Sequence, residues 1–134
     1  MLENVVSISP ETLVGEIAKA KYDGYRFVTM TCVELDADTI EVIYHFDRNF
    51  TLKNYRLAVP KNVDIPSISH IFMAAFLVEN EIQDMFHLKF NGLIIDFNRT
   101  LYFDDEVQSA PLCRYSVSKT KSPESEQSQS PGDA

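Results

Sequence analysis

Alternating apolar and polar residues predict three consecutive β-strands in the first half of the chain, at Tyr25 to Leu35, Thr39 to Asp47 and Thr51 to Val59. In the middle strand the even-numbered residues from Ile40 to Phe46 share one face and the odd-numbered residues share the other. Short turns separate the strands, and turns this short join antiparallel neighbours. The pattern therefore predicts an antiparallel meander with one buried face and one partly wet face.

A helix is predicted on each side of this meander. The segment Ser9-Pro10-Glu11 starts the first helix with a capping hydroxyl, a proline at the first helical position and an acid near the positive end of the dipole; Asp23-Gly24 ends it. A longer helix is predicted from Ser67 to about His87, and a short terminal hairpin around Asn98-Arg99. This order predicts an α+β two-layer sandwich, with an antiparallel three- to four-stranded sheet packed against two helices.

The 134 residues fit one domain, which we place at residues 1–115. Residues 116–134 are rich in Ser, Gln, Glu, Lys and Pro, and they carry few apolar side chains. Such a segment cannot bury enough surface to offset the entropy of ordering it. The sequence therefore predicts a disordered polar tail.

A net charge of −8 makes nucleic acid an unexpected partner, because phosphate binding needs clustered Lys and Arg. The same charge disfavours direct docking on an anionic membrane surface. The longest apolar run, Ile71 to Val78, is too short to span a bilayer, and Met1 to Pro10 lack the pattern of a signal peptide. We therefore expect membrane contact only through other subunits.

The chain offers few residues for redox or metal chemistry. Cys32 and Cys113 are far apart, so the chain cannot hold an iron–sulfur cluster on its own thiolates. The three histidines, His45, His70 and His87, show no metal-ligand spacing. We expect no catalytic residue, no cofactor and no metal on this chain.

The predicted long helix has two unusual features. Met73, Phe76 and Leu77 lie off its sheet-facing stripe, so either the first helix or a partner protein must cover them. Glu79 projects into the apolar stripe, where a carboxylate has to be paired, hydrogen-bonded or protonated. An ion pair, an edge position, an interface pair and a general acid or base all remain open for Glu79. The available cations are Arg26, Arg48, Arg56, Arg99 and Lys89.

The segment Leu77 to Phe90 resembles the signature of the NuoC-type, or "30 kDa", subunit of respiratory complex I. Five residues match that signature position by position: Glu79, Glu81, Asp84, Met85 and Phe86. Three positions depart from it, with Asn80 in place of Arg, Gln83 in place of an aromatic residue and His87 in place of Gly. The short form of the chain looks more like the corresponding subunit of Ech-type membrane-bound [NiFe] hydrogenases.

This resemblance implies a non-catalytic subunit that supports assembly and stability of an electron-transfer arm. Such subunits lie on the cytoplasmic side of the cell membrane, against a nickel-bearing large subunit and an iron–sulfur small subunit. The [NiFe] centre and the Fe–S clusters are then expected in those partners. The complexes couple ferredoxin-linked hydrogen formation to ion translocation. We predict that the docking surface consists of Met73, Phe76, Leu77, Asn80, Glu81 and Asp84.

Three alternatives remain. The chain could be the corresponding subunit of an NADH- or ferredoxin:quinone oxidoreductase of the complex I type. It could also be a stand-alone protein-binding module or homo-oligomer of similar fold. Finally, a small enzyme could use Glu79, Glu81, Asp84 and His87, although carboxylates catalyse proton transfer only when they face a substrate pocket. The acidic pair Glu81 and Asp84 could bind a cation, but a solvated helix face is the usual meaning of such a pair.

Overall fold

The computed structural model describes residues 4–102 and Leu112, and it has the α+β fold class that the sequence predicts. The main sheet has four strands in the order β1-β4-β3-β2. The central meander agrees closely with the predicted one, because β2 is Arg26–Glu34, β3 is Thr39–Arg48 and β4 is Thr51–Pro60. These three strands pair antiparallel.

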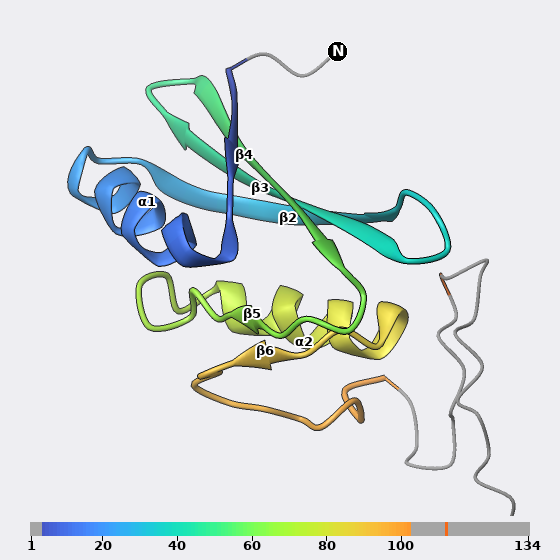
Figure 1. Cartoon of the computed structure of the whole chain (residues 1–134). Helices are drawn as coiled ribbons and strands as arrows, with labels where there is room; N and C mark the ends of the chain where they lie inside the picture. The colour runs from blue at the N-terminus through green and yellow to red at the C-terminus, as the bar shows by residue number, and fades with distance from the viewer. Residues whose placement is uncertain (1–3, 103–111, 113–134) are drawn as a thin grey trace, which may run out of the picture.

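The sheet is mixed, which corrects the prediction of a purely antiparallel one. Its fourth strand is β1, Val5–Ile8, which pairs in parallel with β4. In Figure 1 this strand is deep blue and crosses in front of β4. Four residues are too few for their pattern to predict a strand. The segment becomes β1 because the open edge of β4 offers it hydrogen-bond partners.

The first helix, α1, spans Pro10–Tyr22 and begins where the sequence predicts. The backbone N–H of Ser9 donates to the hydroxyl of Thr12 at 3.0 Å, which satisfies one of the groups left open at the helix start. Leu13, Ile17 and Ala20 on its inner face are fully buried. They pack against the inner face of the sheet, and α1 and α2 lie on this same side of it (Figure 1).

The second helix, α2, spans Ala75–Phe86 and is shorter than the predicted helix from Ser67 to His87. Residues 65–66 form a short strand, β5 (Ile65–Pro66), which pairs in parallel with β6 (Phe90–Asn91). Residues 68–74 form successive turns, in which Ile71 and Phe72 both donate to the carbonyl of Ile68. The backbone N–H groups of Ala75 and Phe76 donate to carbonyls only three residues back, at Phe72 and Met73, so the regular helix starts at Ala75.

The core lies between the inner face of the sheet and the two helices. Its fully buried aromatic residues are Tyr44 and Phe46 on β3, Tyr55 on β4 and Phe90 on β6. The outer face of the sheet carries polar pairs instead, which agrees with the predicted wet face. There His45 bridges Thr31 and Asn54, with ring nitrogens 2.8 Å and 2.6 Å from their side-chain oxygens.

The predicted terminal hairpin is wrong for the part of it that the structure describes. Residues 93–102 contain turns and no strand, although Asn98 and Arg99 both have the positive φ of a tight turn. We call residues 88–102 the strap. It runs along the side of α2 that faces away from the main sheet (Figure 1). The predicted polar tail, 116–134, lies outside the described residues, as do Phe103 and Cys113.

Candidate docking surface

Glu79 is the most deeply buried of the acidic residues in α2, and none of its surface is exposed. The Ser67 hydroxyl donates to its Oε2 at 2.6 Å, and the backbone N–H of Ile68 donates to its Oε1 at 2.8 Å. Among the described residues the carboxyl group is thus held by hydrogen bonds, and no ion pair joins it to Arg26, Arg48, Arg56, Arg99 or Lys89. Within the described residues, the expected ion pair and the expected edge position are therefore both wrong for Glu79, whose carboxyl group is buried and hydrogen-bonded.

Burial governs the charge state of Glu79. It raises the pKa of the carboxyl group from 4.5 to about 7, although the hydrogen bonds from Ser67 and Ile68 act in the opposite direction. The buried phenol of Tyr44 interacts with the same carboxyl group: burial first, and the charge of Glu79 second, raise the pKa of Tyr44 well above its ordinary value. Glu79 therefore exchanges its proton near neutral pH inside an apolar core.

Two serines connect Glu79 to the strap. The hydroxyls of Ser67 and Ser69 lie 2.7 Å apart, and the backbone N–H of Ile94 donates to Ser69 at 3.1 Å. When Glu79 is ionised, Ser67 donates its proton to the carboxylate, so Ser69 donates to Ser67 and accepts from the N–H of Ile94. The result is one directed chain of hydrogen bonds from Ile94 to the carboxyl group.

Three further polar side chains of α2 hold the strap, and we call Asn80, Gln83 and Asp84 the clasp. Asn80 donates to the carbonyl of Ile95 at 2.8 Å and accepts from the N–H of Phe97 at 2.9 Å. The other two members of the clasp also bind strap groups, at the N–H of Phe90, the carboxylate of Asp96 and the N–H of Tyr102.

The clasp corrects the predicted docking surface at two positions. Asn80 and Asp84 were expected to face a partner, but they are 0% and 1% exposed because the strap covers them. Met73 and Leu77 do face outward, with 63% and 50% of their surface exposed. Glu81 is exposed as well, and Phe76 is half-buried.

The strap adds two apolar side chains that the sequence reasoning missed, Ile94 and Ile95, which are 41% and 43% exposed. Asn80 donates to the carbonyls of both Phe76 and Ile95, so Ile95 lies beside the turn of α2 that carries Leu77. We call these outward residues the docking face: Met73, Phe76, Leu77, Ile94 and Ile95. The sequence signal for them was weak, since the isoleucines stand in the mostly apolar run Leu93 to Phe97, which gives no sign of which side chains face outward.

Met85, Phe86 and His87, the last residues of the matched segment on α2, form the C-terminal end of that helix. Met85 and Phe86 are half-buried at the end of α2, and the carbonyl of Met85 accepts from the N–H of Leu112 at 3.1 Å. His87 ends the helix in the left-handed conformation, with φ of 54°. This conformation favours glycine, which is the residue that the resembled signature has at this position. No cluster of three metal-binding side chains occurs in the described part of the chain.

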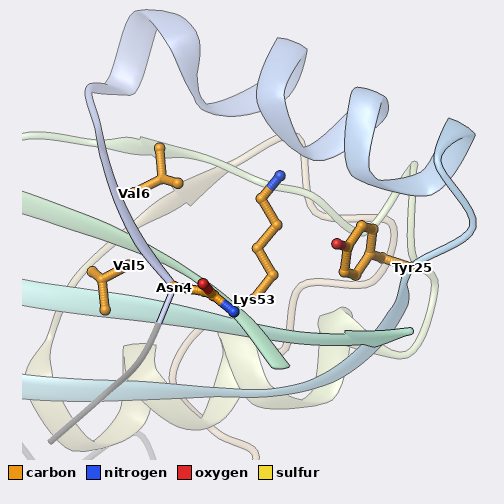
Figure 2. Close-up of a pocket in the computed structure, with 5 residues that line it drawn as sticks. All are labelled: Asn4, Val5, Val6, Tyr25 and Lys53. Carbon is orange, nitrogen blue, oxygen red and sulfur yellow. The ribbon is translucent and has the colours of Figure 1, made fainter. Parts of the chain in front are cut away.

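A hollow of about 290 Å³ lies beside β1 and is lined by Asn4, Val5, Val6, Tyr25 and Lys53 (Figure 2). The ammonium group of Lys53 lies 5.4 Å from the centroid of the Tyr25 ring and 5.2 Å from that of Tyr55. Interaction with the Tyr55 phenol raises the pKa of Lys53, so this lysine is a stable cation. The residues Glu79, Glu81, Asp84 and His87 of the enzyme alternative do not line this hollow.

Comparison with known proteins identifies the family. The family model described as "Respiratory-chain NADH dehydrogenase, 30 Kd subunit" matches residues 6–121, which is most of the chain. The chain belongs to the 30 kDa subunit family of respiratory-chain NADH dehydrogenase. This confirms the resemblance carried by Glu79, Glu81, Asp84, Met85 and Phe86. As a member of the 30 kDa family, the chain is a subunit of an oxidoreductase complex of the respiratory type.

A solved structure supports the fold of this 30 kDa family member. It is a chain of the membrane-bound sulfane sulfur reductase (MBS), an archaeal respiratory membrane complex, with a TM-score of 0.61 at 16% sequence identity. The similarity covers 78% of this chain and 67% of that chain. No curated protein matches the sequence. No helix in residues 4–102 has the length and apolar character needed to cross a membrane.

Proposed function

We propose that the chain is a non-catalytic, peripheral-arm subunit of a membrane-bound energy-converting [NiFe] hydrogenase. In this proposal it lies on the cytoplasmic side of the cell membrane and supports assembly of the electron-transfer arm. Its partners are the nickel-bearing large subunit and the iron–sulfur small subunit, which hold the redox centres. Membership in the 30 kDa family over residues 6–121 carries the subunit role in a respiratory-type complex. The choice of a hydrogenase rests on the resemblance of this short chain to the subunit of Ech-type enzymes.

The position of the motif residues supports an assembly role over a catalytic one. The clasp binds the strap directly, and Glu79 binds it through Ser67 and Ser69. These hydrogen bonds hold Ile94 and Ile95 next to Leu77. A cluster of exposed apolar side chains is typical of a surface that a partner covers. We propose that the docking face binds the large subunit, with Glu81 as a charged residue at its margin.

The first test is the composition of the native complex. The chain is tagged, purified from membranes with mild detergent, and its partners are identified by mass spectrometry. Co-purification of a [NiFe] large subunit is the expected result. Quinone-reductase subunits in its place would assign the chain to a complex I type instead, and a chain that elutes alone in size-exclusion chromatography would favour a stand-alone module.

The second test concerns the docking face. Leu77→Asp places a charge on a half-exposed site, so the isolated chain should stay folded by circular dichroism while it is lost from the complex. Ile82→Asp is the matched control, because Ile82 is only 4% exposed and the same charge there should unfold the chain. A Leu77→Asp chain that co-purifies at the wild-type level would show that docking uses another surface.

The third test concerns the redox centres. We expect the purified chain to be colourless and free of iron, nickel and flavin, because these belong to the partner subunits in this proposal. Metal analysis and absorption spectroscopy of the isolated chain check this. Stoichiometric metal after clean purification would contradict a non-catalytic role.

A further inference from the structure

A second hollow, of about 340 Å³, opens between the end of α1, the start of β2 and the turns before α2. We call it the anchor hollow. Its lining is mainly apolar and includes Phe27, Ile71, Phe72, Met73 and Ala74. It lies on the same side of the sheet as both helices, since Phe72 packs against Phe46 of the core with ring centroids 5.2 Å apart.

The floor of the anchor hollow is held in place by aromatic packing. Phe72 contacts Phe27 at 6.3 Å between centroids, and Phe27 meets Phe46 edge to face at 5.8 Å. Side chains fixed in this way lose little freedom when a ligand covers them. A preformed apolar hollow of this kind suits insertion of one large side chain from a partner.

The rim of the anchor hollow is cationic, although the whole chain carries a net charge of −8. Both charged residues that line it, Lys21 and Arg26, are positive. Asp47 pairs with Arg26 and offsets its charge. Lys21 donates to the carbonyl of Ile71 at 2.6 Å, and within residues 4–102 no carboxylate lies within ion-pair distance of it.

The anchor hollow and the docking face are continuous, because Met73 belongs to both. We propose that a segment of the neighbouring subunit inserts one aromatic or branched aliphatic side chain into the anchor hollow and places a carboxylate beside Lys21. The proposal rests on the proposed function, in which the docking face binds that subunit. The apolar lining selects the inserted side chain. The charge of Lys21, which no carboxylate of residues 4–102 neutralises, selects the acidic neighbour.

The experiment uses the tagged chain in its native complex and measures the yield of co-purified partner. Lys21→Glu should lower this yield at least about tenfold, because a like charge now faces the partner carboxylate. Lys21→Gln, which removes the charge without reversing it, should lower it less. Lys19→Glu is the matched control, since Lys19 is exposed in the same last turn of α1 and does not line the hollow.

A second variant tests the hollow independently of charge. Ala74 lines it and is exposed, so Ala74→Trp fills the space without burying new surface in the core and should also release the partner. Circular dichroism confirms folding of each variant. The proposal is overturned if folded Lys21→Glu or Ala74→Trp retains the wild-type yield, or if Lys21→Gln and Lys21→Glu lose the partner equally, which would leave the charge without a role.

These outcomes separate the anchor hollow from the proposed function. If Leu77→Asp releases the partner while the Lys21 and Ala74 variants keep it, the docking face stands and the anchor hollow alone fails. If mass spectrometry identifies a complex without a [NiFe] subunit, the proposed function fails, and the same variants still decide whether that partner occupies the hollow.

Discussion

The main sheet with α1 and the half of the molecule built on α2 bury their polar groups in different ways. In the sheet, neighbouring strands satisfy each other's backbone, and the side chains that meet the core are apolar. On α2, the polar side chains Glu79, Asn80, Gln83 and Asp84 are themselves buried. Asn80, Gln83 and Asp84 bind backbone groups of the strap. Glu79 binds Ser67 and Ile68, and it is connected to the strap only through Ser69. The first arrangement depends on apolar volume and the second on individual hydrogen bonds.

This difference predicts that the two halves respond to different substitutions. Removing apolar volume from the sheet should destabilise the whole domain, because the core joins all the strands and both helices. Removing a polar group from α2 should open the strap locally, because that group serves one short segment. The following four predictions test this contrast, beginning with the largest effect.

Leu57→Ala should lower the free energy of unfolding by about 3 kcal/mol, since Leu57 on β4 is fully buried and leaves a cavity. Far-UV circular dichroism during urea unfolding measures the change, and every probe should report the same transition. Leu52→Ala removes the same atoms from a half-exposed site on the same strand, so it should cost under about 1 kcal/mol. Equal costs at both sites would contradict a core that spans the inner face.

Glu79→Gln should remove a pH dependence of stability. The folded chain keeps the Glu79 proton up to about pH 7, whereas the unfolded chain releases it near 4.5. Between these values the folded state binds more protons, so stability falls as pH rises, by up to about 3 kcal/mol in total. Glutamine mimics the protonated form by accepting from Ile68 and donating to Ser67.

The difference in unfolding free energy between Glu79→Gln and wild type should therefore grow in favour of the variant from pH 5 to pH 8. Urea unfolding at a series of pH values measures it. The comparison cancels the contributions of the other titrating groups. A difference that stays constant over this range would mean that Glu79 is ionised in the folded chain at all these pH values.

Asn80→Asp should loosen the strap at a local cost of about 1–3 kcal/mol. Aspartate can still accept from the N–H of Phe97 but cannot donate to the carbonyl of Ile95. Hydrogen exchange should become faster at strap amides such as Phe97 and Tyr102, while the amides of β3 keep their protection. Uniformly faster exchange across β3 and the strap would show that the two halves unfold as one unit.

His87→Gly should raise stability by up to about 1 kcal/mol, because glycine adopts the left-handed conformation at the end of α2 without steric cost. His87→Val should lower it, since a β-branched side chain resists positive φ. The melting temperatures of the two variants, read against wild type, check the order. The reverse order would mean that the contacts of the histidine side chain outweigh the strain.

The sequence predicts the sheet half well, because strand alternation and helix capping are local signals. No end of β2, β3 or β4 differs from its predicted position by more than one residue, and α1 starts at Pro10 as expected. The pattern could not reveal β1, whose pairing with β4 depends on a contact between segments far apart in sequence. Nor could it reveal where α2 begins, because Ile68, Ile71 and Phe72 keep helical spacing within a series of turns.

The candidate site was harder to predict, for a physical reason. Helical periodicity assigns polar residues to the outside, so Asn80 and Asp84 were expected in contact with solvent or a partner. A buried polar residue is stable when backbone groups satisfy it, and these groups belong to the strap, which has no regular pattern of its own. Met73 and Leu77 are apolar residues off the predicted stripe, and both are exposed, whereas their role in docking stays a prediction.

The parallel pairing of β1 with β4 also bears on the order in which the chain folds. Its register pairs Val5 with Asn54 and Ile8 with Leu57, far apart in sequence, whereas the β2–β3 and β3–β4 turns close over a few residues. Closing a long loop costs more chain entropy than closing a short one. The meander should therefore form early, with β1 adding to its edge late. During synthesis the first strand emerges from the ribosome before its partner exists, and it must wait until β4 has been made.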